Sequence, residues 1–177
     1  MKNIVTIMGK TPQIEEEVYI DPSSRIIGDV FLKKGCSIWP MCVLRADSNQ
    51  IVIEDEAAIL DKVLIEAPAN NPVVVGKRAL VSHGAILHGC TIQEGALVGI
   101  GAIVLDGTIV GKGSVIGAGS VVSPQMVIPE NSLVLGIPGK VIRPLKPDEV
   151  QKTSSQVDEV KQKADQYRTN LDKEEGI

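Results

Sequence analysis

The chain is poor in aromatic residues. Of its 177 residues, aromatic side chains make up only 2%, namely Tyr19, Phe31, Trp39 and Tyr167. The interior must therefore be built from Val, Ile, Leu and Ala, and an aromatic stacking platform for single-stranded nucleic acid is excluded. The formal net charge of −4 also gives no electrostatic reason to bind nucleic acid. We expect no nucleic-acid partner.

Long apolar runs and an export signal are also missing. No segment approaches the roughly 20 apolar residues of a membrane-spanning helix, and the first residues lack the apolar stretch and cleavage site of a secretory signal. The three cysteines are an odd number, which favours reduced thiols over a disulfide framework. These absences predict a cytoplasmic protein with no membrane partner. With only two histidines, a metal site is short of imidazole ligands.

A six-residue repeat dominates what is present. An aliphatic residue recurs every sixth position, and the residue four places later is nearly always small, with Met126 and Pro138 as the exceptions. The aliphatic positions are Ile20, Ile26, Leu32, Ile38, Leu44, Ile53, Ile59, Ile65, Val75, Val81, Leu87, Ile92, Val98, Val104, Val110, Ile116, Val122, Ile128 and Val134. Neither a helix nor an alternating strand has this period. It predicts an all-β solenoid, a parallel β-helix with three short strands per coil and coils stacked about 4.8 Å apart.

The repeat is interrupted at three places. The step from Leu44 to Ile53 is three residues too long, the step from Ile65 to Val75 is four too long, and the step from Leu87 to Ile92 is one too short. We expect the extra residues of the first two breaks to loop out, and both loops are candidates for a site. Cys36 and Cys42 occupy the small inward position of their hexads and are expected to be core residues.

The hexads end near Arg143, and a helix is expected after them. Pro147 and two acidic residues suit the first turn of a helix, and an apolar stripe follows at Val150, Val157, Ala164 and Leu171. The stripe can pack along the solenoid or on a partner subunit. The sequence thus predicts a β-helix domain over residues 11–145 and a C-terminal amphipathic helix over residues 146–173.

Rotating the hexads through three faces predicts which residues stack. If the two insertions loop out, Leu44, Ile65 and Leu87 share a face of successive coils, so that Arg45, Glu66 and His88 follow them in one outward column. On the preceding face, Leu60 lies under Ser82 and Asp61 under His83. Two histidines and a glutamate are therefore expected in adjacent columns.

Four segments resemble the γ-class carbonic anhydrase family, which includes the relatives once called ferripyochelin-binding proteins. They are Arg45-Ala46-Asp47, the stretch from Ser82 to Ile92, the stretch from Val98 to Gly107, and the stretch from Leu135 to Lys140. The resemblance covers about residues 11–145. It implies that the β-helix is left-handed, that three chains form a homotrimer, and that each metal ion lies between two subunits.

The resemblance also implies a metal-ligand set. The family binds its metal through three histidines, two from one chain and one from a neighbour, and His83 and His88 match two of them. The position of the third holds Glu66. Ala58 and Leu60 replace an asparagine and a glutamine of the family pattern, whereas Arg45, Asp47 and Asp61 are retained as catalytic-site residues.

Each of these residues has a second interpretation. Two imidazoles and a carboxylate can bind zinc, with iron or cobalt as alternatives, but Glu66 can instead pair with Arg45 in its column. Arg45 and Asp47 resemble the family's ion pair between subunits, although exposed residues of this kind are often only solvated. Asp61 can orient His83 from behind or be an ordinary turn acid.

The leading functional hypothesis is a trimeric, metal-dependent, carbonic anhydrase-like protein that hydrates CO2 to bicarbonate. Glu66 lowers the formal charge of the site, and Leu60 removes a hydrogen-bonding amide, so the activity is expected to be weak or lost. The alternatives are a non-catalytic assembly or binding subunit of the same fold and, less favoured, a hexapeptide acyltransferase with a histidine base.

Overall fold

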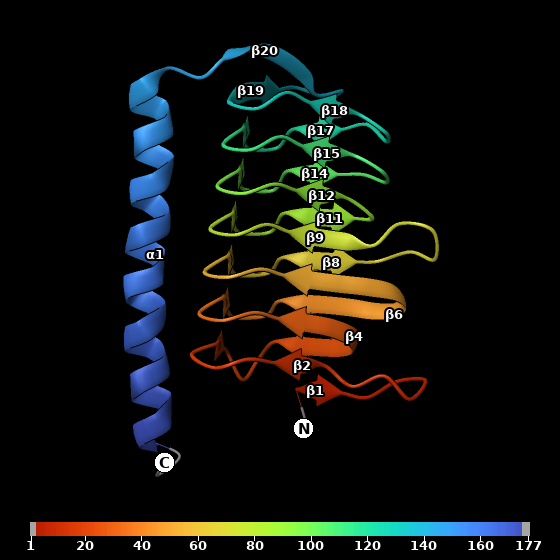
Figure 1. Cartoon of the computed structure of the whole chain (residues 1–177), viewed down its shortest axis with the longest axis vertical. Coiled ribbons are helices and arrows are strands. Elements are labelled where there is room, and N and C mark those ends of the chain that lie inside the picture. The colour runs from red at the N-terminus through yellow and green to blue at the C-terminus, as the bar shows by residue number, and fades with distance from the viewer. Residues whose placement is uncertain (1–2, 175–177) are drawn as a thin grey trace.

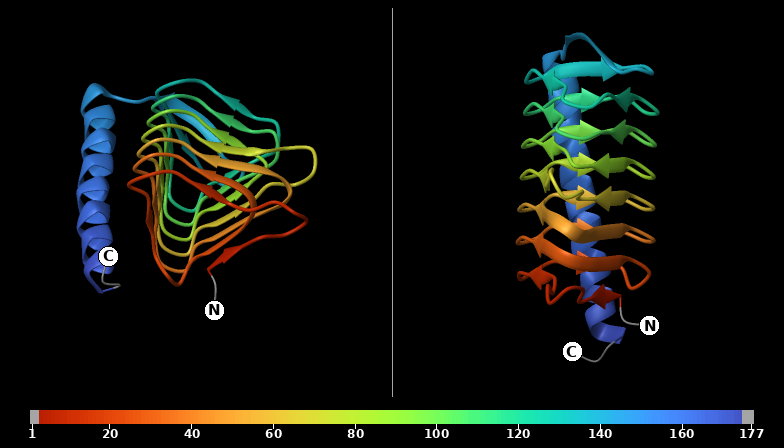
Figure 2. Two further views of the ribbon diagram at one scale, coloured as in Figure 1. Left: turned by 60° about the horizontal axis from the view of Figure 1, so that its bottom comes forward. Right: turned by 90° about the vertical axis from the view of Figure 1, so that its right-hand side faces the viewer.

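The structure is a computed structural model that describes residues 3–174, and side chains are described for residues 3–171. Short parallel strands stack into a solenoid of about seven turns, and one long helix stands beside it (Figure 1). Seen toward its end, the solenoid is a stack of triangular coils (Figure 2). The predicted fold class, a parallel β-helix of hexapeptide repeats with a C-terminal helix, is confirmed.

Three faces run along the solenoid, and we name them by their place in the chain. The first face contains β1 (Ile4–Val5), β4 (Arg25–Leu32), β6 (Val43–Ile53), β8 (Leu64–Glu66), β11 (Ile86–His88), β14 (Ile103–Val104) and β17 (Val121–Val122). The second face contains β2 (Gln13–Ile14), the later halves of β4 and β6, β9 (Val73–Val75), β12 (Thr91–Ile92), β15 (Ile109–Val110) and β18 (Val127–Ile128).

The third face lies next to the helix, and we call it the helix face. It contains β3 (Tyr19–Ile20), β5 (Ser37–Ile38), β7 (Ala58–Ile59), β10 (Leu80–Val81), β13 (Leu97–Val98), β16 (Val115–Ile116), β19 (Ser132–Leu135) and β20 (Lys140–Pro144). All neighbours on this face are parallel except β20, which runs antiparallel to β19 at the end of the stack. The antiparallel strand covers the last parallel edge, which would otherwise be open to pairing.

The core follows the hexad pattern. Every aliphatic repeat position from Ile26 to Val134 is at most 1% exposed, and Ile20 packs against this core as a partly buried residue. Cys36, Cys42 and Cys90 are free thiols, all buried. The inward residues form one continuous apolar column through the coils. Stacking the coils buries these side chains, because a single coil alone would leave them exposed to water.

The two insertions behave differently. Residues 67–72 leave the sheet between β8 and β9, as expected of a loop. The insertion after Leu44 is not a separate loop between two strands. It forms part of β6, which runs unbroken from the first face onto the second and pairs with β4, with a register shift between Gly28 and Val30. Residues 47–50 of β6 stand opposite Asp29 of β4 alone, so the extra residues form a bulge within a continuous strand instead of the separate loop that was expected.

The helix α1 (Pro147–Glu174) returns from the C-terminal end of the solenoid along the helix face (Figures 1 and 2). Val157 and Ala164 of its apolar stripe are buried there with Tyr19 and Trp39, whereas Val150 is 37% exposed. The rings of Tyr19, Trp39 and Tyr167 lie with centroids 5.3 to 5.8 Å apart. The stripe therefore serves packing on the chain's own solenoid.

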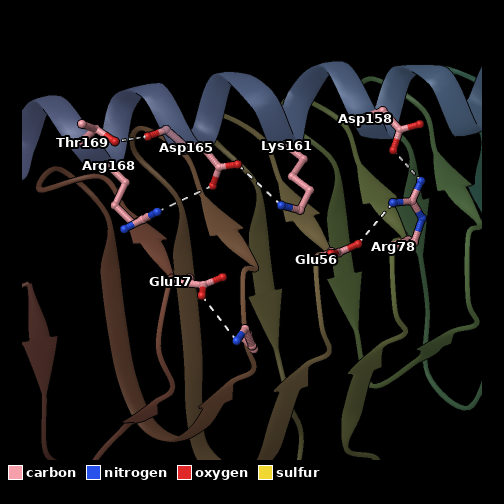
Figure 3. A network of polar contacts seen from close by, with 9 residues as sticks. Glu17, Glu56, Arg78, Asp158, Lys161, Asp165, Arg168 and Thr169 are labelled. Atoms are coloured by element: carbon pink, nitrogen blue, oxygen red, sulfur yellow. Dashed lines mark hydrogen bonds and ion pairs between the residues drawn. The ribbon is translucent and has the colours of Figure 1, made fainter.

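Ion pairs connect the helix to the coils and its own turns to one another (Figure 3). Arg78 lies between Glu56 of a coil, at 3.2 Å, and Asp158 of α1, at 2.7 Å. Within α1, Asp165 contacts Lys161 at 3.5 Å and Arg168 at 3.9 Å. Among the described residues no helix has both the length and the apolar character to cross a lipid bilayer.

Candidate metal centre

The predicted column of outward side chains is present on the first face. The Cα partners in the parallel ladder are Arg45 with Glu66 and Glu66 with His88, across β6, β8 and β11. The stacking inferred from the hexads is therefore confirmed, although the insertion after Leu44 adopts a strand. The column holds because Leu44, Ile65 and Leu87, one residue earlier, all point into the core.

Arg45 joins two carboxylates. Its Nη1 is 2.9 Å from Asp47 Oδ2, and its Nη2 is 2.6 Å from Glu66 Oε1. The hydrogen bond from Arg45 holds the pKa of Asp47 below its ordinary value, and the same bond raises the pKa of Arg45. All three side chains are partly exposed, with 41% exposure for Arg45, 23% for Asp47 and 28% for Glu66. Glu66 does pair with Arg45, which was one of the two interpretations of this residue.

His83 lies at the corner between the helix face and the first face. Its Nδ1 is 2.9 Å from Asp61 Oδ2, in the coil before it, and its side chain is 52% exposed. The predicted stacking of Asp61 under His83 is confirmed by this contact and by the bond from Gly84 N to Asp61 O. Asp61 therefore contacts the ring that it was expected to orient.

His88 has an equivalent partner that the sequence analysis missed. Its Nδ1 is 2.8 Å from Asp106 Oδ1, in the coil after it. Leu87 pairs with Val104 in the ladder, so Asp106 stands directly next to Gly89. Carrying the face assignment one coil further would have placed Asp106 beside the His88 corner.

The three candidate ligands do not meet within one chain. His83 lies in the turn before β11 and His88 is the last residue of that strand, so the two side chains leave the chain at opposite ends of β11. Two nitrogen ligands of one zinc ion lie within about 4 Å of each other. Consistent with this, residues 3–171 contain no group of three or more His, Cys, Asp or Glu side chains arranged to hold a metal ion.

Leu60 lies beneath α1. It is 7% exposed and belongs to the cluster that packs the helix onto the coils, with Leu80 and Val157 among its members. It also lines a groove of about 590 Å³ between α1 and the helix face, where His83 lies at the margin. The side chain at this position therefore serves helix packing as well as bordering the candidate site.

The donor atoms fit a metal of the zinc type if two chains contribute them. Because Nδ1 of each histidine contacts a carboxylate, Nε2 is the ring nitrogen left with a lone pair for a metal. One carboxylate oxygen of Glu66 contacts Arg45, and its second oxygen remains to ligate a metal. Two imidazole nitrogens and a carboxylate oxygen are a ligand set of catalytic zinc sites.

Comparison with known proteins gives related results from sequence and structure. The family described as "Bacterial transferase hexapeptide (six repeats)" matches residues 89–124. A Methanocaldococcus jannaschii protein named "Probable carbonic anhydrase" is 42% identical over 137 residues, which cover 77% of this chain and 86% of that protein.

Two further relatives extend the comparison. The mitochondrial gamma carbonic anhydrase 2 of Arabidopsis thaliana is 36% identical over 99 residues, covering 52% of this chain and 36% of the plant protein. The chain thus matches only about a third of the length of that plant relative. A solved hexapeptide transferase family protein of Anaplasma phagocytophilum has a TM-score of 0.90 at 30% identity, covering 94% of this chain and 98% of that one.

Proposed function

Since the chain belongs to the γ-carbonic anhydrase family of hexapeptide-repeat proteins, we propose that it is a carbonic anhydrase-like homotrimer with a metal site between subunits. Glu66 and His88 of one chain and His83 of its neighbour hold the metal, with zinc as the first candidate and iron or cobalt as alternatives. The observation that carries this proposal is the pairing of both histidines, through Nδ1, with carboxylates of adjacent coils.

The proposal of an oligomer follows from the separation of the ligands. His83 is at one edge of the first face, and Glu66 and His88 are at the other edge, one coil apart. A second chain whose His83 corner lies against this column would complete the set of three. The side chain of His83 is 52% exposed and that of His88 is 32% exposed, so both are accessible to a neighbour.

A metal ion held by these three residues would lower the pKa of a bound water molecule, to about 7 in typical catalytic zinc sites, and so supply the nucleophile for CO2 hydration. Arg45 balances the charge of Glu66 and holds one of its oxygens. Asp61 and its contact with His83 Nδ1 keep that ring in one orientation. Leu60 places an apolar side chain beside His83, where it can exclude water but cannot hydrogen-bond a substrate.

We propose that this activity is weak or lost. A carboxylate in place of a neutral imidazole lowers the formal charge of a divalent site from +2 to +1, so less of the bound water is ionised at neutral pH. The apolar Leu60 removes a donor that would otherwise orient the nucleophile or the developing charge.

The contact of 2.6 Å between Arg45 and Glu66 also favours a second candidate, a non-catalytic assembly or binding subunit. In that function Glu66 is an ion-pair partner only, and the two histidines hold no metal. The likeness to the Anaplasma protein, a member of a hexapeptide transferase family, supports the third candidate of the sequence analysis, a hexapeptide acyltransferase. Stabilisation against heat by acetyl-CoA would support the third candidate over both others.

Light scattering and elemental analysis test the proposal on protein purified without an affinity tag or chelator. The expected mass is three times the 18.8 kDa of the chain, with about one metal ion per chain in the native protein and sharply less in Glu66→Ala. Glu94→Ala, which removes the exposed partner of Lys112, is the matched control and should keep the metal. A monomer, or a trimer without metal after exposure to zinc, contradicts the proposed metal site.

A further inference from the structure

The two histidines receive their carboxylates from opposite directions along the solenoid. Asp61, the partner of His83, lies in the preceding coil, whereas Asp106, the partner of His88, lies in the following coil. Asp61 and His83 occupy equivalent positions of their coils. Asp106 is displaced by one residue from the His88 column, because Leu87 pairs with Val104. Its carboxylate therefore has to reach back across Gly89.

Gly89 provides the space for that reach. A Cβ atom on Gly89 would collide with Asp106 Oδ1 and would lie 2.7 Å from Asn71 Cβ. The residue also has a φ of +55°, in the left-handed region that favours glycine. The carboxylate of Asp106 occupies the volume that a side chain at position 89 would fill.

The backbone around Asp106 is held by the neighbouring coils. Gly107 N donates to Gly89 O at 2.7 Å, and Gln125 N donates to Asp106 O at 2.8 Å. These bonds fix the corner on both sides of Asp106, one coil above and one coil below. The side chain thus starts from a defined position, and its contact with His88 Nδ1 does not depend on a mobile loop.

We propose that Asp106 is a positioning residue for His88. Its carboxylate accepts the hydrogen of Nδ1, which selects the tautomer with the lone pair on Nε2 and fixes the plane of the ring. The inference rests on the proposed function for the role of Nε2 as a metal ligand. The tautomer itself is a property of the chain without metal.

Nitrogen NMR of the metal-free protein tests the tautomer directly. The chain has only two histidines, so ¹⁵N-histidine labelling gives two rings, which His83→Gln assigns. At about pH 9, where a histidine ring is ordinarily neutral, the His88 ring of the wild type should carry its single nitrogen-bound hydrogen on Nδ1. Asp106→Ala should shift its ¹⁵N signals toward a mixture of tautomers and leave those of His83 unchanged. Asp61→Ala should do the reverse.

Zinc affinity, measured by competition with a chelator, gives the second readout. Asp106→Ala should weaken zinc binding about ten- to hundredfold, and Asp106→Asn should fall between it and the wild type, because the amide oxygen can still accept from Nδ1. Ser123→Ala, on the next coil, is the control and should bind as the wild type does.

The two readouts separate failure of the inference from failure of the proposed function. If Asp106→Ala leaves the His88 tautomer unchanged, the inference is wrong whatever the zinc result. If the tautomer changes but neither the wild type nor any variant binds zinc, Asp106 does orient His88 and the proposed metal site is wrong. If the tautomer of His88 changes in Asp106→Ala but the zinc affinity does not, Asp106 has no role in metal binding.

Discussion

Arg45 and Glu66 are Cα partners on adjacent coils, and Arg45 Nη2 lies 2.6 Å from Glu66 Oε1 while Nη1 of the same guanidinium contacts Asp47. One cation therefore serves two carboxylates in the column that also contains His88. This arrangement reduces the negative charge that Glu66 brings to the candidate site. It also gives Glu66 a reason to be present that does not involve a metal.

The first prediction concerns that shared cation. In Arg45→Gln, zinc should bind several-fold more tightly, because a positive charge next to the ion is removed and Glu66 is free to ligate. The measurement is competition with a chelator, and Lys112→Gln, which breaks an exposed ion pair elsewhere, is the control. Weaker binding would mean that Arg45 holds Glu66 in its ligating position.

The second prediction is that CO2 hydration increases when the site is changed to the family pattern. Glu66→His and Leu60→Gln together should raise the rate more than either change alone, and the effects should be non-additive because both act on one nucleophile. Leu60→Gln should also destabilise the protein by about 1–3 kcal/mol, since Leu60 is buried under α1.

Stopped-flow assays on zinc-, cobalt- and iron-loaded protein measure the rate of CO2 hydration, and thermal unfolding measures the loss of stability in Leu60→Gln. Brisk turnover by the wild type would contradict the proposal that Glu66 and Leu60 weaken the activity. A double variant that binds metal fully and stays inert would place the defect elsewhere, with Ala58 as the next candidate.

The third prediction concerns the attachment of α1. Tyr167 contacts Tyr19 and Trp39 with ring centroids 5.8 and 5.3 Å away, and each such aromatic pair contributes about 0.5–1.5 kcal/mol. Tyr167→Ala should therefore increase amide hydrogen exchange in the C-terminal half of α1 and leave the coils unchanged. Gln166→Ala, at the adjacent exposed position, should leave exchange as in the wild type. Equal exchange in both variants would show that the helix is held on the coils without the ring of Tyr167.

The fourth prediction concerns pH. Arg143 donates to both oxygens of Glu149 at 2.7 and 2.8 Å, and these bonds, with one from Lys146 N, lower the pKa of Glu149 from 4.5 to about 2. A carboxyl group whose pKa is lowered by folding stabilises the folded chain at pH values above its ordinary pKa. This stabilisation is lost as the pH falls through the pKa of the folded state.

The start of α1 should thus lose stability between about pH 4.5 and pH 2, and Glu149→Gln should abolish that part of the pH dependence. The helical circular dichroism signal in urea, followed at several pH values, measures it. Glu159→Gln on the same helix is the control. A variant with the wild-type pH profile would contradict the assignment to Glu149.

The fifth prediction concerns the thiols. Burial raises the pKa of Cys42 and Cys90 to about 12 and also raises that of Cys36. Because the thiolate is the reactive form, a disulfide reagent should not modify the native protein at neutral pH and should modify all three cysteines after unfolding. Rapid reaction of one thiol in the folded state would show that its coil opens.

The hexad period was sufficient to predict the core and the columns. A solenoid coil returns to the same face after a fixed number of residues, so Leu44, Ile65 and Leu87 had to align once the breaks were located, and Arg45, Glu66 and His88 had to follow them. The contact between Asp61 and His83 could be predicted for the same reason. Stacking registers are a property of the repeat, and the repeat is visible in the sequence.

Only the tertiary structure decided the features that the period does not control. The extra residues after Leu44 became a bulge within one strand because β4 pairs with β6 on both sides of them, at Ala46 and at Ile51. Leu60 was buried because α1, whose packing partner the sequence left open, returned along the helix face. Asp106 reached His88 because Gly89 left a space between coils. Each outcome depends on which groups meet through space and on the room between them, and a six-residue repeat specifies neither.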